Sequence, residues 1–254
     1  MNKIIRQLPT IIRFESGRIL TSWKIVASVV ATTLLMLVSY NATLDQADDP
    51  NNFIYPMVAS MALVISIYAA TSASDIISDE FEKRSGLVMM TQPVNRYILF
   101  IGKFISLYLV GTMLVTLCYM IMVTLCHTTY GHVPHVLWES YALAMLYLFA
   151  AIGICMTVSA LSPSSSLSIT VCLIIMVIPL FFFQNVTFDS EPWYVIWYDS
   201  RIISNHILGI ETIFDSNMLT DDYQPLLSTA TYMMGLYGII TTALSSVLFR
   251  YRQI

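Results

Sequence analysis

Cysteine and histidine side chains gather in one short stretch of the sequence, where together they could hold a metal ion. Cys126 and His127 are followed closely by His132 and His135. A thiolate with imidazoles suits copper or zinc. Their spacing matches no fixed zinc template, and Gly131 indicates a turn-rich loop instead. We therefore expect no metal site in the chain and keep a copper-handling role as an alternative.

Segment 75–97 holds the densest charge in the sequence, directly beside apolar residues. We expect the preceding helix to extend through Asp79 to Arg84, Gly86 to end it, and a turn to form at Pro93. A charged helix end beside an apolar patch is typical of a docking site for a cytoplasmic protein. A solvated loop is the alternative interpretation. The candidate contact residues are Glu80, Glu82, Lys83, Arg84, Gly86, Pro93 and Arg96.

Composition identifies the environment in which these residues must be positioned. The 254 residues are 57% hydrophobic and 11% charged, with a net charge of −4 and a mean hydropathy of +0.71. Soluble domains carry about 25% charged residues, so an ordinary cytosolic enzyme and a nucleic-acid binder are both excluded. Runs of about 20 apolar residues predict membrane-spanning helices. The sequence contains six such runs, at 23–44, 53–74, 98–126, 141–161, 166–184 and 225–248.

The basic residues predict how these spans are oriented. Every Lys and Arg except Arg201 falls before or at the start of the first span, between the second and third, at the start of the third, or after the last. Because cytoplasmic loops are enriched in basic residues, we expect both termini to be cytoplasmic. The fold class is therefore all-α: a multi-pass protein of the cell membrane with six spans, surrounded by lipid.

The residues before the first span have the pattern of an amphipathic helix. Within 1–22, apolar side chains share one helical face, and Pro9 must start or kink the helix. We expect this helix to lie in the inner interface, the alternative being a plain basic flank. The apolar face consists of Ile4, Ile5, Leu8, Ile11 and Ile12.

The segment 185–224, between the last two spans, is unusually long for a loop and contains an aromatic cluster. Trp and Tyr prefer the membrane–water interface, so we expect one or two short helices dipping into the outer leaflet. A purely interfacial anchor is the alternative. The cluster includes Trp193, Tyr194, Trp197 and Tyr198.

Charges are nearly absent from the middle of the predicted spans. Lys24 and Lys103 lie at span ends, where long side chains can reach the interface. Ionisable groups deep in the spans would have indicated a proton or ion pathway. Their absence argues against a proton-coupled transporter and favours a lipid-like, amphiphilic or peptide substrate.

These segments resemble a known family. The run Glu80-x-Glu82-Lys83-Arg84-Ser85-Gly86, then Pro93-Val94-Asn95-Arg96, then Gly102-Lys103, resembles the cytoplasmic loop of type 2 ABC-exporter permeases. The sequence departs from the family pattern at Leu87, where threonine is frequent, and at Asn95, where serine is usual. Six spans, an amphipathic N-terminal helix and a long outer segment are also similar, so the resemblance covers essentially the whole chain.

The resemblance implies that the chain is a permease half that pairs with a second half, identical or related, and docks on cytoplasmic ABC ATPase subunits. Segment 75–97 would couple the two proteins, and the outer aromatic segment would act as a gate. The sequence contains no G-x-x-x-x-G-K-[ST] phosphate loop. ATP and Mg would therefore bind in the partner ATPase, and this chain would be neither an enzyme nor a cofactor protein.

The sequence thus predicts a transmembrane permease domain over 1–254, serving an ATP-driven exporter. A non-transporting scaffold subunit of a larger membrane complex and a copper-handling permease remain as alternatives.

Overall fold

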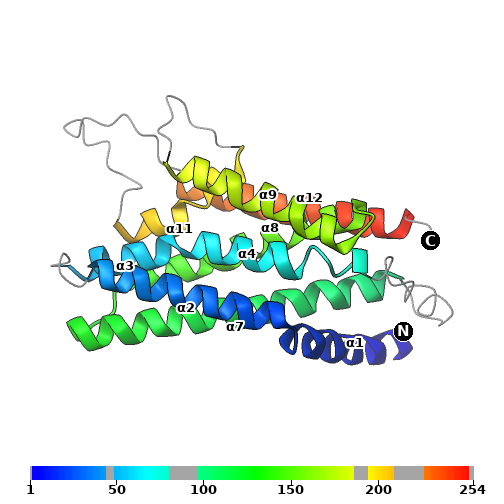
Figure 1. The fold of residues 1–254 in the computed structure, drawn as a ribbon, viewed down its shortest axis with the longest axis horizontal. Coiled ribbons are helices and arrows are strands. Elements are labelled where there is room, and N and C mark those ends of the chain that lie inside the picture. Colours follow the sequence, from blue (N-terminus) through cyan, green and yellow to red (C-terminus); the bar gives the residue numbers. More distant parts are fainter. Residues whose placement is uncertain (1, 44–48, 80–95, 186–193, 209–225, 252–254) are drawn as a thin grey trace.

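The computed structural model describes residues 2–43, 49–79, 96–185, 194–208 and 226–251. Within these ranges all regular elements are helices (Figure 1). They are α1 (Asn2–Leu20), α2 (Trp23–Thr43), α3 (Pro50–Ala59), α4 (Met61–Ser72), α7 (Arg96–Tyr130), α8 (Val136–Leu161), α9 (Ser165–Asn185), α10 (Ile196–Asp199), α11 (Ile202–Asn205), the short 3-10 helix η1 (His206–Leu208) and α12 (Leu227–Tyr251).

Six segments are long and apolar enough to cross a membrane: α2, α3 with α4, α7, α8, α9 and α12. This confirms the predicted number of spans and the all-α fold class. The third span is longer than predicted. Helix α7 contains 35 residues, whereas the predicted span covers 98–126. At about 1.5 Å per residue it is about 52 Å long, well beyond the roughly 30 Å of a bilayer core.

The second span differs from the single helix expected from its continuous apolar run. It is divided into α3 and α4 at Ser60, whose hydroxyl bonds to the carbonyl of Met57 at 2.6 Å. Pro56 lies inside α3 and has no N–H to continue the helical ladder. The helix also ends at Ser72 instead of extending through Asp79 as predicted, and residues 73–77 are non-helical.

The spans form a bundle with a central and a peripheral layer. The α3–α4 span and α8 have the largest shares of buried residues, whereas α2, α9 and α12 have the smallest. Exposed apolar side chains on the outer helices, such as Leu34 and Ile239, are in the position to contact lipid. The bundle therefore has its tightly packed core around α8.

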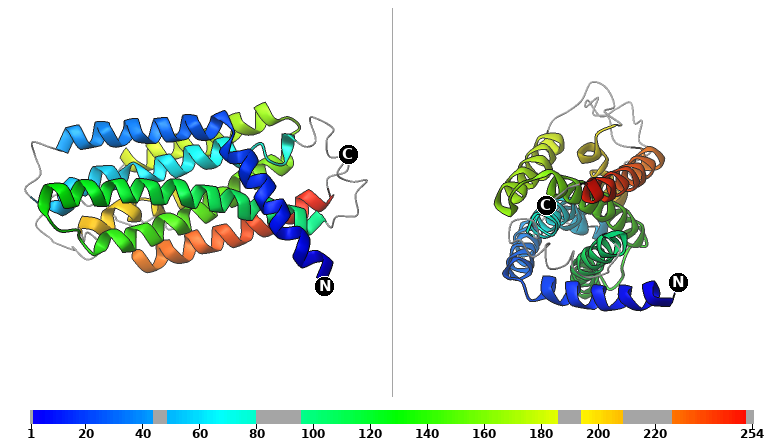
Figure 2. Two further views of the ribbon diagram at one scale, coloured as in Figure 1. Left: turned by 90° about the horizontal axis from the view of Figure 1, so that it is seen from below. Right: turned by 90° about the vertical axis from the view of Figure 1, so that its right-hand side faces the viewer.

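Helix α1 runs across the bundle instead of along it (Figure 2). It is a continuous helix from Asn2 to Leu20, so it passes through Pro9 and does not begin there. Ile11 and Ile12 are half-buried and Ile19 is buried. The first turns of α1 and the end of α12 lie at the same end of the bundle, and α10 and α11 lie toward the other (Figure 1).

Candidate functional site

Residues 73–79 connect α4 to the charged part of segment 75–97, and we call them the anchor segment. The helix is interrupted after Ser72, so the backbone N–H groups of Ile77 and Ser78 need acceptors other than the carbonyls of a continuous helix. Ser159 on α8 replaces those partners: its Oγ accepts hydrogen bonds from the backbone N–H of Ile77 at 3.2 Å and of Ser78 at 3.1 Å. Both acceptor and donors are buried, so this contact fixes the anchor segment to the core helix.

Two more helices hold the anchor segment through its carbonyl groups. Ser168 on α9 donates its hydroxyl to the carbonyl of Ser74 at 2.5 Å. Lys103 on α7 donates from Nζ to the carbonyl of Ile76 at 3.2 Å. The chain leaving α4 is thus bonded to α7, α8 and α9, and any displacement of it pulls on three helices.

Lys103 also makes a buried ion pair that the sequence did not reveal. Its Nζ lies 3.2 Å from Oε1 of Glu15 on α1, and the two side chains are 0% and 1% exposed. We expected Lys103 to reach the interface, but it bonds inward because α1 supplies a carboxylate there. Arg18 contacts the other carboxylate oxygen at 3.1 Å. A buried charge is tolerated only when it is paired in this way.

Helix α1 approaches α7 closely where this pair forms. A Cβ added at Gly102 would lie 2.6 Å from Cγ2 of Ile11, so only glycine permits this spacing. One turn further on, Ser106 donates its hydroxyl to the carbonyl of Ile12 at 3.2 Å. The Gly102–Lys103 pair singled out in the sequence is therefore the docking point of α1.

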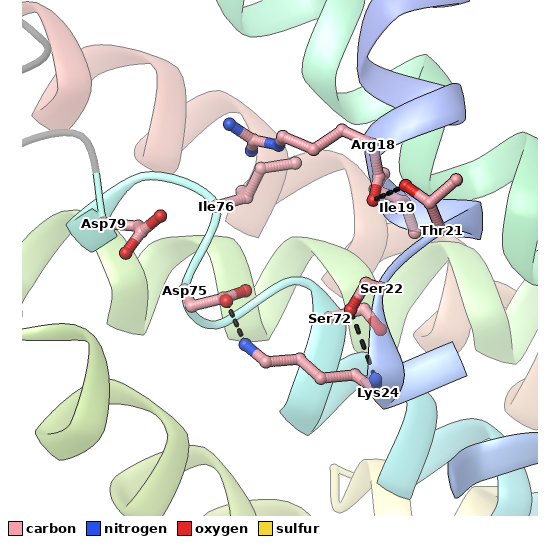
Figure 3. A pocket seen from close by; sticks show the side chains of 9 residues that line it. All are labelled: Arg18, Ile19, Thr21, Ser22, Lys24, Ser72, Asp75, Ile76 and Asp79. Atoms are coloured by element: carbon pink, nitrogen blue, oxygen red, sulfur yellow. Dashed lines mark hydrogen bonds and ion pairs between the residues drawn. The ribbon is translucent and has the colours of Figure 1, made fainter. Parts of the chain in front are cut away.

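A second ion pair at the same junction joins α2 to the anchor segment. Lys24 contacts Asp75, and both side chains are only partly buried (Figure 3). This pair and the pair of Glu15 with Lys103 together connect α1, α2, the anchor segment and α7 at one end of the bundle.

Most of the predicted coupling residues lie outside the described residues: Glu80, Glu82, Lys83, Arg84, Gly86 and Pro93. Arg96 is the first residue of α7. The structure therefore describes the two attachments of this loop: the anchor segment precedes residue 80, and α7 follows residue 95.

The opposite end of the bundle contains the described part of the predicted outer segment. Trp193 lies outside the described residues, Tyr194 is exposed, and Trp197 is partly and Tyr198 fully buried. The carbonyl of Tyr194 accepts a hydrogen bond from Tyr237 of α12 at 2.6 Å. Helix α10 packs against α9 and α12, and α11 against α3 and α8. These short helices are therefore packed onto the bundle.

Asp199, the last residue of α10, is a buried acid that the sequence did not single out. It is 1% exposed, and its Oδ2 has no hydrogen-bond partner among the described residues. Burial raises the pKa of this carboxyl to about 8, because desolvation disfavours the charged form. Asp199 lies near Tyr237 of α12, and the neighbouring Ser200 lies near Tyr147 of α8.

The cysteine and histidines considered for a metal are not brought together. Cys126 is buried, with its Sγ 3.4 Å from the carbonyl of His132, and the three histidine side chains are exposed. Nδ1 of His135 lies 3.5 Å from Oε1 of Glu139. In the described part of the chain, no group of three His, Cys, Asp or Glu residues could hold a metal ion.

Comparison with known proteins agrees with this architecture. Residues 10–252 match the family described as "ABC-2 family transporter protein". A search of curated proteins gave no match. The match covers all six candidate spans and both ends of the charged loop. The chain is a multi-pass membrane protein and belongs to the ABC-2 family of transporter proteins, as the permease of an ABC transporter.

Proposed function

We propose that the chain is the membrane-spanning half of an ATP-driven exporter in the cell membrane. It would pair with a second half, identical or related, and be driven by separate cytoplasmic ABC ATPase subunits that bind ATP and Mg. The observation that carries the proposal is the family match over residues 10–252. Both termini and the loop 80–95 would face the cytoplasm, as the distribution of basic residues indicates.

The anchor segment supports a mechanical role for this loop. An ATPase bound to residues 80–95 would displace the chain that enters at Asp79 and leaves at Arg96. At the first attachment, the displacement would act on α8 and α9 through Ser159 and Ser168. At the second it would act on α7 directly, and α1 would move with α7. The ATPase must bind more strongly to one arrangement of these helices than to the other, or no work is transmitted.

The spans themselves support an uncharged or amphiphilic passenger. Within the candidate spans of the described structure, Lys24, Lys103, Glu139 and Arg250 are the Lys, Arg, Asp and Glu residues, and each lies toward a span end. Because a transported ion needs polar groups at mid-membrane depth, a lipid-like, amphiphilic or peptide substrate fits better. The outer segment with Tyr194, Trp197 and Tyr198 would form the outer gate.

A double charge reversal tests the coupling role. Glu80→Lys with Glu82→Lys should abolish ATPase binding or uncouple hydrolysis from transport, because it reverses the charge that the partner would contact. The matched control is Asp221→Lys with Asp222→Lys, an equal change of charge on the predicted outer side. ATPase retention and hydrolysis are measured on the purified complexes. If both double variants behave like the wild type, the loop is not a coupling element. That result would favour the scaffold subunit over the exporter.

A further inference from the structure

A cavity of about 320 Å³ opens at the junction of α1, α2 and the anchor segment (Figure 3). It lies where the apolar run of α2 begins, so it is at the boundary between the membrane and water. That volume is at the lower end of the range of small-molecule sites. The lining residues are Arg18, Ile19, Thr21, Ser22, Lys24, Ser72, Asp75, Ile76 and Asp79. We call it the junction cavity.

Among the described residues, one hydroxyl in the wall of the junction cavity has no hydrogen-bond partner. Ser72 is 7% exposed, and its Oγ has no hydrogen-bond partner among the described residues. A buried polar group without a partner is costly, and most such groups in folded proteins are satisfied by protein, water or ligand. The hydroxyl is therefore available to bind a polar group in the cavity.

The charges around the cavity are balanced, which restricts the ligand. Arg18 and Lys24 are cationic, whereas Asp75 and Asp79 are anionic. Arg18 also contacts Glu15, and Lys24 contacts Asp75, so both cations on the wall have an acidic neighbour. A free anion would not be attracted strongly, because the wall of the cavity carries no excess of positive charge. A ligand with an anion and a cation close together would match both signs at once, and a primary ammonium can donate hydrogen bonds to the carboxylates.

The surface beside the cavity is apolar and exposed. Leu20 is 44% exposed at the end of α1, and on α2 Trp23 and Val26 are 80% and 46% exposed. Tryptophan is enriched at the membrane–water interface. A ligand whose polar end enters the junction cavity can therefore lay hydrocarbon chains against these residues, which a water-soluble ligand cannot do.

We propose that the junction cavity binds the headgroup of a phosphoethanolamine phospholipid. The phosphate would accept hydrogen bonds from the Ser72 hydroxyl and from Arg18. The ammonium would donate to Asp79 and Asp75, and the acyl chains would lie along Leu20 and Trp23. The proposal does not depend on the transported substrate or on an ATPase.

Lipid binding to the purified full chain, with any subunits that accompany it, tests the proposal. Native mass spectrometry gives the dissociation constants for phosphatidylethanolamine and phosphatidylcholine of identical chains. The ethanolamine lipid should bind about tenfold or more tightly, because choline cannot donate the hydrogen bonds that a carboxylate accepts from a primary ammonium. Equal dissociation constants would overturn the proposal.

Variants locate the site. Ser72→Ala should weaken binding of the ethanolamine lipid about tenfold without lowering the melting temperature of the lipid-free protein, because it removes a hydroxyl that has no partner among the described residues. Arg18→Gln should weaken binding of both lipids, whereas the control Arg13→Gln, exposed on the same helix, should not. If Ser72→Ala binds like the wild type, or if Arg13→Gln and Arg18→Gln act alike, the cavity is not the site.

A final comparison identifies the source of the headgroup. Soluble glycerophosphoethanolamine carries the same polar groups without acyl chains. It should not displace the lipid at millimolar concentration, because it lacks the acyl chains whose burial strengthens binding of the lipid. Displacement by the soluble compound would overturn the assignment to a membrane lipid.

Discussion

The free energies of unfolding of variants in which Lys103, Glu15 or both are replaced by methionine measure how strongly this ion pair holds α1 on the bundle. The pair is 0% and 1% exposed, with Nζ and Oε1 3.2 Å apart. Glu15→Met leaves a buried ammonium without its carboxylate, although it still donates to the carbonyl of Ile76. Removing one member of a buried pair costs about 3–5 kcal/mol, and we expect this variant to reach that range.

The two single variants should differ because their partners differ. In Lys103→Met, the carboxylate of Glu15 keeps its contact with Arg18 at 3.1 Å, so we expect a smaller loss of about 1–3 kcal/mol. The double variant removes both charges and keeps apolar volume. Since replacing a whole buried pair by apolar residues is often neutral or stabilising, it should lie within about 1 kcal/mol of the wild type.

Equilibrium unfolding in mixed micelles gives these four free energies of unfolding and the coupling energy of the double-mutant cycle. The half-exposed pair Lys24 and Asp75, 36% and 22% exposed, is the matched control. A cycle of Lys24→Met with Asp75→Asn should show a coupling below about 1 kcal/mol. If the losses at Glu15 and Lys103 simply add, the buried pair does not hold α1 in place and the reasoning is refuted.

Three further changes have expected outcomes. Burial raises the pKa of Asp199 from 3.8 to about 8, so the folded chain holds a proton that a solvated carboxyl loses. The contribution of Asp199 to stability should therefore be largest below pH 3.8 and fall by about 1.4 kcal/mol per pH unit as the pH rises between those values. Asp199→Asn should remove this slope from melting temperatures measured against pH. A Cβ at Gly238 would lie 2.1 Å from the ring of Phe149, whereas Gly235 has nothing within 4 Å; Gly238→Ala should therefore cost about 1–3 kcal/mol in unfolding experiments, and Gly235→Ala should not destabilise. Ser159→Ala leaves two buried N–H groups without their acceptor, so it should cost about 1–3 kcal/mol and make the protease sites of the adjoining loop more accessible in limited proteolysis.

The spans could be predicted because each is a long apolar run, and the length of such a run is a property of the sequence alone. The break at Ser60 could not, because the residues on both sides are equally apolar and no charge interrupts them. Pro56 was the available signal, but proline is tolerated in membrane helices. The exit from α4 was missed for a related reason: the side chains that bond to residues 73–79 come from other helices.

The candidate site was predicted in part. Lys103 was recognised as the start of the third span, but its partner Glu15 is 88 residues away, and only the crossing of α1 over α7 brings them together. Asp199 lies in the predicted outer segment 185–224, yet its burial depends on how α10 packs against α9 and α12. Local patterns indicate which segments span the membrane, whereas tertiary packing decides which charges become buried.

The central claim is that this chain transmits the work of a separate ATPase. Purification of the tagged full-length chain in mild detergent, followed by identification of its partners and assay of ATP hydrolysis, tests it most directly. We expect a co-purifying subunit with a G-x-x-x-x-G-K-[ST] phosphate loop and hydrolysis that vanadate inhibits. Recovery of other membrane subunits without any ATPase would contradict the claim.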